Sequence, residues 1–339
     1  MMRYRRGLVV GKFCPLHRGH MLVIDTALAA CDEVVVISYT NPAFDGCVKT
    51  VREGWLQQLY PQVRSLVLDG SEGIVVPHND APDAEHRDFC GWICLQMLGG
   101  AVDAVFTSED YGDGFAQALT RYFALPGLEV AHVCVDKARL RLPISGTRLR
   151  ADPFAHRAFL DPRVYASFVQ RVCILGAESS GKTTLADALA AQLDTAWVPE
   201  FGRELWVEKS GALSFDDLGH IAQVQVAREE ALVQSANRWL ICDTSPLTTL
   251  CYSEAMFGAA HPALAALAVR PYDVVFLCDL DIPFVQDGTR RDTDFRNIQQ
   301  KWYRDRLDEM QIAYTVLAGP LAERLRQATT ILLTSLETP

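Results

Sequence analysis

The feature that most constrains this chain is a pair of glycine-rich motifs, each of which directly follows a short apolar run. The first motif, GKFCPLHRGH, occupies residues 11–20 and follows the apolar residues 7–10. The second, GAESSGKT, occupies residues 176–183 and follows the apolar residues 172–175. A strand that passes through a glycine-rich turn into a helix presents backbone N–H groups to an anion. The sequence therefore predicts two phosphate-binding strand–turn–helix units, about 160 residues apart.

Composition narrows the class of protein. The chain has 339 residues, which suits two domains, and its hydrophobic fraction of 49% is sufficient for two cores. A net charge of −10 argues against a nucleic-acid partner, which normally requires a basic surface. No apolar run reaches the roughly 18 residues of a membrane helix, and Lys12, His17 and Arg18 interrupt any signal segment. We therefore expect a cytoplasmic protein without a membrane or nucleic-acid partner.

Short apolar segments alternate with helical patterns along both halves of the chain. Strands are expected at residues 7–10, 33–38, 65–68, 104–107 and 129–135, and then at 172–175, 239–242, 274–278 and 313–317. Helices are expected at residues 20–30, 50–60, 88–98 and 115–123, and then at 182–193 and 214–235, with a short helical connector at 152–171. This alternation predicts an α/β fold of two domains, residues 1–168 and 169–339, each a parallel sheet covered by helices.

The ten cysteines do not form a disulfide framework in a reducing compartment. Four of them fall in apolar runs and are expected to be buried in strands, namely Cys134, Cys173, Cys242 and Cys278. His86, Cys90 and Cys94 follow helical spacing, but the first and last lie roughly 12 Å apart along a helix. Such ligands cannot converge on one zinc ion with bonds of about 2 Å, so helix packing is the better interpretation.

The first motif contains the HxGH pattern of nucleotidyltransferases, which act at the α-phosphate of ATP. His17 and His20 are three residues apart, so both side chains can lie on one side of the first helical turn. Their N–H groups can then stabilise the charge that develops during direct attack by a substrate phosphate. A lone HxGH also arises by chance among surface histidines, but the preceding strand favours the functional interpretation. The ATP contacts expected here are Gly11, Lys12, Phe13, His17, Gly19 and His20.

A second element, PISGTRLR at residues 143–150, resembles the ISSTxxR signature that closes nucleotidyltransferase domains. Arg150 stands at the position that clamps the β- and γ-phosphates, and a guanidinium suits this role because it pairs bidentately. Gly146 replaces the second serine of the signature. The alternative interpretation is the basic start of an ordinary helix. The remaining ATP contacts expected in this half are Ser108, Tyr111, Ser145 and Thr147.

The second motif is a Walker A loop, which holds the β- and γ-phosphates of a nucleotide. Lys182 is expected to bridge these phosphates, and Thr183 to ligate Mg²⁺. The run LICDT at residues 240–244 has Walker B form, so Asp243 is expected to hold Mg²⁺ or to act as the base for a substrate hydroxyl. The ATP contacts expected in this half are Gly176, Ala177, Glu178, Ser179, Ser180, Gly181, Lys182, Thr183, Thr184, Arg290 and Arg291.

Further segments of the second half suit a substrate and a lid. Glu200 and Arg203 follow an extended run, where small-molecule kinases place a substrate-binding acid. The segment DGTRRD at residues 287–292 has the form of an arginine lid, although a solvated charged loop is the alternative. Four aromatic residues are candidates for contact with a planar base, and each is equally plausible as core: Trp197, Trp206, Tyr252 and Phe257.

These motifs, in this order, resemble the NadR family of bifunctional nicotinamide mononucleotide adenylyltransferases and ribosylnicotinamide kinases. The resemblance covers nearly the whole chain and implies a nucleotidyltransferase domain followed by a P-loop nucleoside kinase. It implies that Mg-ATP is used to phosphorylate nicotinamide riboside to NMN, and then to adenylylate NMN, giving NAD and pyrophosphate. A homo-oligomer is possible. Repressor members carry an N-terminal helix-turn-helix, whereas this chain begins at the first strand, so we do not expect DNA binding.

The sequence departs from the family near the kinase substrate. Residues 198–199 read Val-Pro where the family places an aromatic before its acidic motif, and Ser-Pro follows Thr244 where an acid and an aromatic are usual. One rival is the coenzyme A synthase fusion of an adenylyltransferase with dephospho-CoA kinase, whose Walker loop normally begins Gly-Gly-Ile-Gly. Another is a sensor that binds NAD and ATP without turnover. The intact residues His17, His20, Lys182 and Asp243 argue against a sensor.

Overall fold

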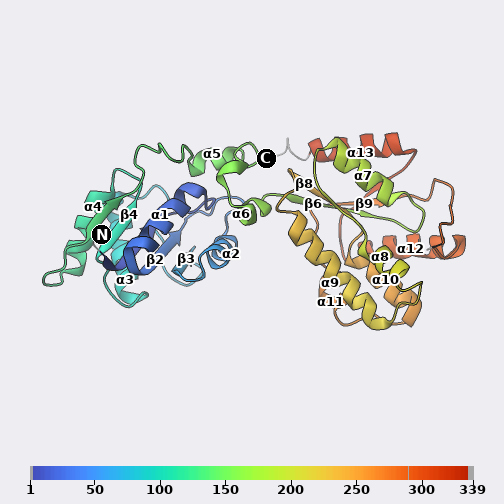
Figure 1. Ribbon diagram of the computed structural model, residues 1–339, viewed down its shortest axis with the longest axis horizontal. Coiled ribbons are helices and arrows are strands. Elements are labelled where there is room, and N and C mark those ends of the chain that lie inside the picture. Colours follow the sequence, from blue (N-terminus) through green and yellow to red (C-terminus); the bar gives the residue numbers. More distant parts are fainter. Residues whose placement is uncertain (1–2, 289, 335–339) are drawn as a thin grey trace. The chain divides into compact units, whose positions relative to one another are not determined.

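The computed structural model describes residues 3–288 and 290–334 of the chain. The chain divides into two compact units, Met1–Phe168 and Val169–Pro339. Each unit is built on its own five-stranded sheet with helices packed around it (Figure 1). Within the described ranges, no helix combines the length and the apolar character needed to span a bilayer.

The first unit has a parallel sheet in the order β3-β2-β1-β4-β5. Its strands are β1 (Tyr4–Val10), β2 (Cys31–Tyr39), β3 (Arg64–Leu68), β4 (Ala104–Thr107) and β5 (Ala131–Cys134). Its helices are α1 (Arg18–Ala30), α2 (Lys49–Leu59), α3 (Asp83–Gln96), α4 (Gly112–Phe123), α5 (Gly146–Ala151), the 3₁₀ helix η1 (Arg157–Phe159) and α6 (Pro162–Ala166). Strand β1 is central, so the first motif leaves the sheet where the strand order reverses, which is the usual ligand position in such sheets.

The second unit repeats this plan with the parallel order β10-β9-β6-β8-β7. Its strands are β6 (Gln170–Leu175), β7 (Trp197–Val198), β8 (Trp239–Asp243), β9 (Val274–Cys278) and β10 (Thr315–Leu317). Its helices are α7 (Lys182–Gln192), α8 (Phe201–Glu208), α9 (Phe215–Leu232), α10 (Pro246–Phe257), α11 (Leu264–Leu267), α12 (Thr293–Glu309) and α13 (Leu321–Thr334). Strand β6 is central, so the second motif also begins at the point of reversal.

Burial on both sheet faces explains why the strands are apolar runs rather than alternating patterns. In β6, Val172 and Ile174 belong to the core formed with α7 and α13. The intervening Cys173 and Leu175 belong to a second core formed with α9, α10 and α12. Side chains alternate between the two faces of a strand, so both faces of β6 are buried.

The predicted α/β fold class is confirmed, and the expected strands recur with shifted ends. Strand β1 starts at Tyr4, upstream of the expected start, because Tyr4 pairs with Cys31 of β2. Strand β6 starts at Gln170, so the expected helical connector ends earlier than residue 171.

One cysteine prediction is wrong, because Cys134 is exposed at the end of the edge strand β5. Cys173, Cys242 and Cys278 are buried, and all ten cysteines are free. In α3, His86 and Cys90 both contact the hydroxyl of Tyr39, at 2.9 Å and 3.8 Å. These side chains thus take part in packing α3 against β2.

Candidate active sites in the two units

The two histidines of the first motif form a reciprocal cap at the start of α1. His17 is the N-cap, and its Nδ1 accepts from the N–H of Gly19 at 3.1 Å and of His20 at 3.4 Å. The N–H of His17 in turn donates to His20 Nδ1 at 3.4 Å. Because Nδ1 accepts in both rings, each neutral ring carries its proton on Nε2. Both histidines can therefore donate a hydrogen bond through Nε2.

The same environment keeps the two rings uncharged. Burial, reinforced by Arg139, lowers the pKa of His17 to about 4. Burial and the neighbouring His17 hold the pKa of His20 well below 6.5. The rings stack with their centroids 3.6 Å apart, an arrangement that two imidazolium ions would oppose. At neutral pH the pair therefore consists of neutral donors in the ligand-free protein.

Arg150 of the second nucleotidyltransferase signature packs directly on the first motif. Its Nη1 donates to the carbonyl of Cys14 at 2.7 Å, and its guanidinium lies 4.2 Å from the centroid of the Phe44 ring. A Cβ added to Gly146 would lie 3.1 Å from the same carbonyl oxygen, which explains the glycine in place of serine. Ser145 caps α5 by accepting from the N–H of Arg148. The fold thus brings together motifs far apart in sequence.

Other predicted contacts of the first unit lie at the same edge of its sheet. Lys12 Nζ donates to the carbonyl of Asn79 at 3.3 Å and lies 5.7 Å from the Phe44 ring centroid. Thr147 accepts from Arg150 Nη2 at 3.2 Å. Phe44 and Asn79 lie on loops after β2 and β3 and were missed from the sequence, because neither belongs to a recognisable motif.

The rest of the predicted first-site set also follows strand ends. Phe13 is buried with a φ of +48°, and its ring meets His20 edge-on at 4.9 Å. Gly11 follows β1, where its N–H donates to the carbonyl of Ile37 at 3.1 Å. Ser108 and the exposed Tyr111 follow β4.

The second motif has the backbone of a phosphate-binding loop. Gly176, Ser179 and Gly181 have φ values of +146°, +55° and +83°. At the end of the loop, Thr183 Oγ1 donates to Asp243 Oδ2 at 2.6 Å. The other carboxylate oxygen, Asp243 Oδ1, is buried and has no hydrogen-bond partner among the described residues. A hydroxyl beside a carboxylate oxygen with free capacity is a donor set that suits Mg²⁺.

Ala177 and Glu178, two of the predicted ATP contacts, have N–H groups that donate to side chains of α12. The N–H of Ala177 donates to Gln300 Oε1 at 3.2 Å, and that of Glu178 donates to Gln299 Oε1 at 2.8 Å. Both glutamines come from α12. Lys182 Nζ donates to the carbonyl of Ala177 at 3.1 Å.

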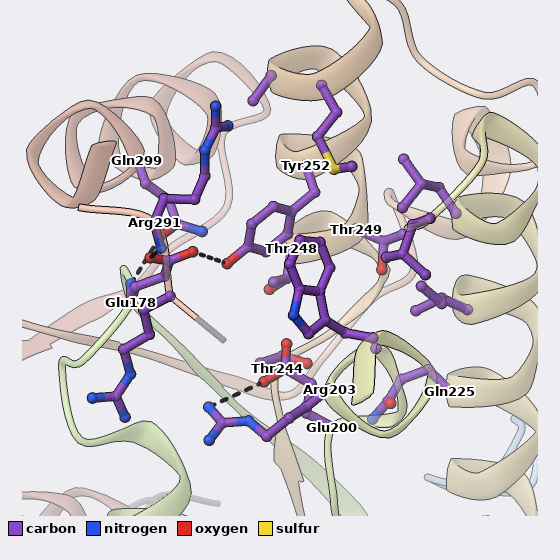
Figure 2. A pocket seen from close by; sticks show the side chains of 18 of the residues that line it. Glu178, Glu200, Arg203, Gln225, Thr244, Thr248, Thr249, Tyr252, Arg291 and Gln299 are labelled. Atoms are coloured by element: carbon purple, nitrogen blue, oxygen red, sulfur yellow. Dashed lines mark hydrogen bonds and ion pairs between the residues drawn. The ribbon is translucent and has the colours of Figure 1, made fainter. Parts of the chain in front are cut away.

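The predicted lid, residues 287–292, and Val285 just before it contact the loop, with Thr289 outside the described residues. The carboxylate of Glu178 accepts from the N–H of Arg291 at 2.7 Å and from the hydroxyl of Tyr252 at 2.8 Å (Figure 2). Ser179 Oγ accepts from the N–H of Val285 at 2.9 Å and from Arg290 Nη1 at 3.2 Å. Glu178 and Ser179 of the loop therefore hold this segment.

A cavity of about 390 Å³ opens beside the loop and the lid (Figure 2). Its charged and polar wall is contributed by Glu178, Lys182, Glu200, Arg203, Gln225, Thr244, Thr248, Thr249, Arg290, Arg291 and Gln299. Its apolar and aromatic wall is contributed by Trp206, Leu213, Leu218, Ile221, Tyr252, Ala255 and Met256. A lining that combines charged, polar and aromatic side chains suits a ligand with a hydrophilic part and a flat ring.

Two acids near Lys182, namely Glu200 of the cavity wall and Asp243 at the end of β8, have raised pKa values. Burial raises the pKa of Glu200, an effect that Lys182 opposes and Asp243 reinforces. Burial likewise raises the pKa of Asp243, opposed first by Lys182 and then by the hydroxyl of Thr183. Arg203 lies 3.9 Å from Glu200 and 3.5 Å from Asp287 of the lid. Acids with raised pKa values beside a lysine in a cavity are typical of functional sites.

The aromatic candidates separate into two groups. Trp206 and Tyr252 line the cavity. The prediction fails for Trp197, which packs with the core of α7, β6 and β8, and for Phe257, which is 41% exposed and packs on Phe215. A cavity residue missed from the sequence is Gln225. The detectable signal was a glutamine on the same face of α9 as Leu218 and Ile221.

These features define an α/β protein that joins a unit with an HxGH motif to a unit with a P-loop. A family described as AAA domain matches residues 171–324. The chain is 30% identical to the trifunctional NAD biosynthesis/regulator protein NadR of Escherichia coli over 301 residues, or 84% of this chain and 71% of that protein. The same identity and coverage hold for NadR of Salmonella typhimurium.

Two crystal structures of NadR share the fold. The complex with NAD and AMP-PNP has a TM-score of 0.67 at 18% identity, over 98% of this chain and 96% of that one. The complex with NR has a TM-score of 0.70 at 19% identity, over 97% of this chain and 95% of that one. The chain belongs to the NadR family, as its motifs predict.

Proposed function

We propose that the second unit phosphorylates nicotinamide riboside with ATP, and that the first unit transfers the adenylyl group of a second ATP to the resulting NMN. The products are NAD and pyrophosphate. The observation that carries this proposal is one cavity lined both by Lys182 and Glu200 and by the rings of Trp206 and Tyr252. Membership in the NadR family supports it, as do NadR structures that contain NAD, AMP-PNP and NR.

In the kinase step, Lys182 exchanges the Ala177 carbonyl for the β- and γ-phosphates of ATP. Thr183 and Asp243 would hold Mg²⁺, which when bound neutralises phosphate charge. Glu200 and Arg203 bind the hydroxyls of the riboside, and the half-buried Glu200 is suited to accept a hydroxyl proton. The primary hydroxyl oxygen attacks the γ-phosphorus, its proton goes to a carboxylate, and ADP leaves.

In the transfer step, the phosphate of NMN attacks the α-phosphorus of ATP in line, and pyrophosphate leaves. No nucleophile from the protein is needed. His17 and His20 donate from Nε2 to the phosphate oxygens, on which charge accumulates. Arg150 leaves the Cys14 carbonyl and pairs with the β- and γ-phosphates, where a planar guanidinium can bind two oxygens at once.

The substrate of the kinase is assigned from the chemistry of the cavity. Nicotinamide riboside carries a flat, positively charged ring and a polar ribose. Tyr252 and Trp206 offer aromatic faces, which attract a cation through their quadrupoles. Glu178 adds a carboxylate, and the hydrogen bonds that it accepts from described residues come from two neutral groups, a hydroxyl and a backbone N–H, so a negative charge borders the cavity that can favour a cationic ligand.

The test is incubation of purified protein with ATP and equal concentrations of nicotinamide riboside, uridine, adenosine and dephospho-CoA, with products identified by mass. We expect NMN and then NAD, with the riboside strongly preferred. Preference for dephospho-CoA would establish the coenzyme A alternative instead, and tight nucleotide binding without any product would establish the sensor. A Lys182→Ala variant controls for contaminating kinase, and Lys301→Ala, on the exposed face of α12, is its matched control.

A further inference from the structure

The side-chain amide of Gln225 is buried and only half satisfied. Gln225 is 2% exposed, and its Oε1 accepts from the N–H of Phe201, the first residue of α8, at 3.0 Å. Its Nε2 has no hydrogen-bond partner among the residues that the structure describes. Because a backbone N–H can only donate, it fixes Oε1 on its own side and leaves Nε2 as the free group. Gln225 therefore offers a donor and not an acceptor.

That donor borders the cavity of the second unit. Gln225 lines the cavity on the same face of α9 as Ile221, one turn before it, and Leu218, two turns before it. Figure 2 shows Gln225 among the side chains that line this cavity, together with Glu200, Arg203 and Tyr252. Buried polar groups are nearly always hydrogen-bonded in native proteins, so an orphaned donor beside a cavity indicates an acceptor supplied by a ligand.

We propose that Gln225 is the residue that recognises the ring substituent of the substrate, by donating from Nε2 to the carboxamide oxygen of nicotinamide riboside. This rests on the proposed kinase function. Ribose hydroxyls are better served by Glu200 and Arg203, since a carboxylate accepts from a hydroxyl and Gln225 does not. The wall that carries Gln225 continues into Ile221 and Leu218, which suit the apolar faces of a ring rather than a sugar.

The kinase should therefore prefer ribosides whose ring carries a hydrogen-bond acceptor on the side that faces Gln225. A pyridinium riboside without the carboxamide fills the aromatic slot but leaves Nε2 unpaired in the complex. Sites built to hydrogen-bond a substrate group reject the analogue that lacks it, because a buried group then stays unsatisfied. From the usual size of such effects we expect wild-type kcat/KM to differ between the two substrates by about 10- to 100-fold.

The test is a cycle of two proteins and two substrates. The kcat/KM of the wild type and of Gln225→Met is measured with nicotinamide riboside and with pyridinium riboside at saturating ATP. We expect the substitution to reduce turnover of nicotinamide riboside and to bring the two substrates within about 3-fold of each other. Loss of the contact to Phe201 affects both substrates alike and so cancels in the cycle. Gln223→Met, on the exposed face of the same helix, is the matched control and should keep the wild-type preference.

A second variant tests whether the residue at position 225 acts as a hydrogen-bond donor to the ring substituent. Gln225→Glu keeps an acceptor for the N–H of Phe201 but replaces the donor by an anionic oxygen. Relative to nicotinamide riboside, it should disfavour nicotinic acid riboside, whose ring bears a carboxylate, by about 10-fold or more compared with the wild type. Equal losses for both substrates in Gln225→Met, with unchanged preference in Gln225→Glu, would overturn the proposal and leave Gln225 as a cap of α8. Failure of the wild type to phosphorylate nicotinamide riboside would instead remove the proposed function itself.

Discussion

Thr183 Oγ1 and Asp243 Oδ2 lie 2.6 Å apart, joining the end of the glycine-rich loop to the end of strand β8. The register of the sheet sets this distance, because Asp243 pairs with Ile174 of the neighbouring strand β6, shortly before the loop begins. The free Asp243 Oδ1 completes a position where the proposed Mg²⁺ and the phosphates of ATP would meet.

Asp243→Asn should lower phosphorylation of nicotinamide riboside by at least about 100-fold, because it removes a metal ligand or a base. Conversion of added NMN to NAD should be unchanged, since Asp243 belongs to the other unit. Initial rates of both reactions, followed by mass, provide the measurement. Asp187→Asn, the same chemical change at an exposed position of α7, is the control. Near-normal riboside phosphorylation by Asp243→Asn would remove this residue from the mechanism.

His20→Ala or His17→Ala should abolish adenylyl transfer while riboside phosphorylation persists. Each ring supplies a neutral Nε2 donor, and His17 also caps α1, so the unfolding transition must be recorded alongside the rate. His156→Ala, in the same unit but outside the motif, is the control. The idea fails if either change removes both activities in a folded protein.

The neutrality of the pair gives a pH prediction. Because burial lowers the pKa of His17 to about 4, its NMR signals in ligand-free protein should not titrate between pH 5.5 and 8 and should shift only in more acidic solution. A titration midpoint near about 6.5, the value of a free histidine, would show that the ring is solvated and that the buried cap does not persist in solution.

Glu229 makes the stability of the second unit pH-dependent. Burial, opposed by Arg270, raises the pKa of this carboxyl to about 7 from 4.5. The folded state then binds the proton more tightly than the unfolded chain, so this contribution is full below pH 4.5 and is lost as pH rises through 7. Glu229→Gln keeps an acceptor for the Tyr272 hydroxyl and cannot ionise. Urea unfolding at pH 5 and pH 8 should show a smaller fall in stability for the variant, by an amount on the order of 2–3 kcal/mol. Identical pH dependence in both proteins would exclude Glu229 as the source.

Glu178 couples the lid to the loop. Glu178→Ala leaves the Tyr252 hydroxyl and the N–H of Arg291 without their acceptor, so trypsin should cleave at Arg290 or Arg291 several-fold faster than in the wild type. Glu208→Ala, at the exposed end of α8, should leave the cleavage rate unchanged. An unchanged cleavage rate in Glu178→Ala would mean that other contacts, such as those of Ser179 and Arg203, suffice to hold the lid.

Local patterns predicted the parts of the site that depend on neighbouring residues. The apolar runs and the glycines that follow them predicted β1 and β6 with their loops. Both features can be recognised within a short segment, because a buried strand needs a run of apolar residues and a phosphate-binding loop needs glycines at its turn. Their positions at the ends of extended or apolar runs likewise predicted Glu200 and Asp243 as site residues. Their mutual proximity follows from the parallel sheet, whose carboxyl ends share one edge.

Contacts between distant segments were not predictable. Gln299 and Gln300 occupy two amides of the loop from α12, more than a hundred residues away in sequence. Trp197 and Trp206 lie on consecutive elements, and only the packing of β7 and α8 decides that the former enters the core and the latter the cavity. The sequence shows only that Gly146 lacks the hydroxyl of a serine. The structure adds that Gly146 lies close to the carbonyl of Cys14, a residue more than a hundred positions away.

The central claim, that each unit performs one of two successive ATP-dependent steps, is tested most directly by mixing two inactive variants. His20→Ala should stop at NMN, and Lys182→Ala should leave nicotinamide riboside untouched while still adenylylating added NMN. Neither variant alone should form NAD from nicotinamide riboside and ATP, whereas an equimolar mixture should form it through free NMN. Absence of NAD from a mixture of two folded variants that each keep their single activity would contradict two independent sites linked by released NMN.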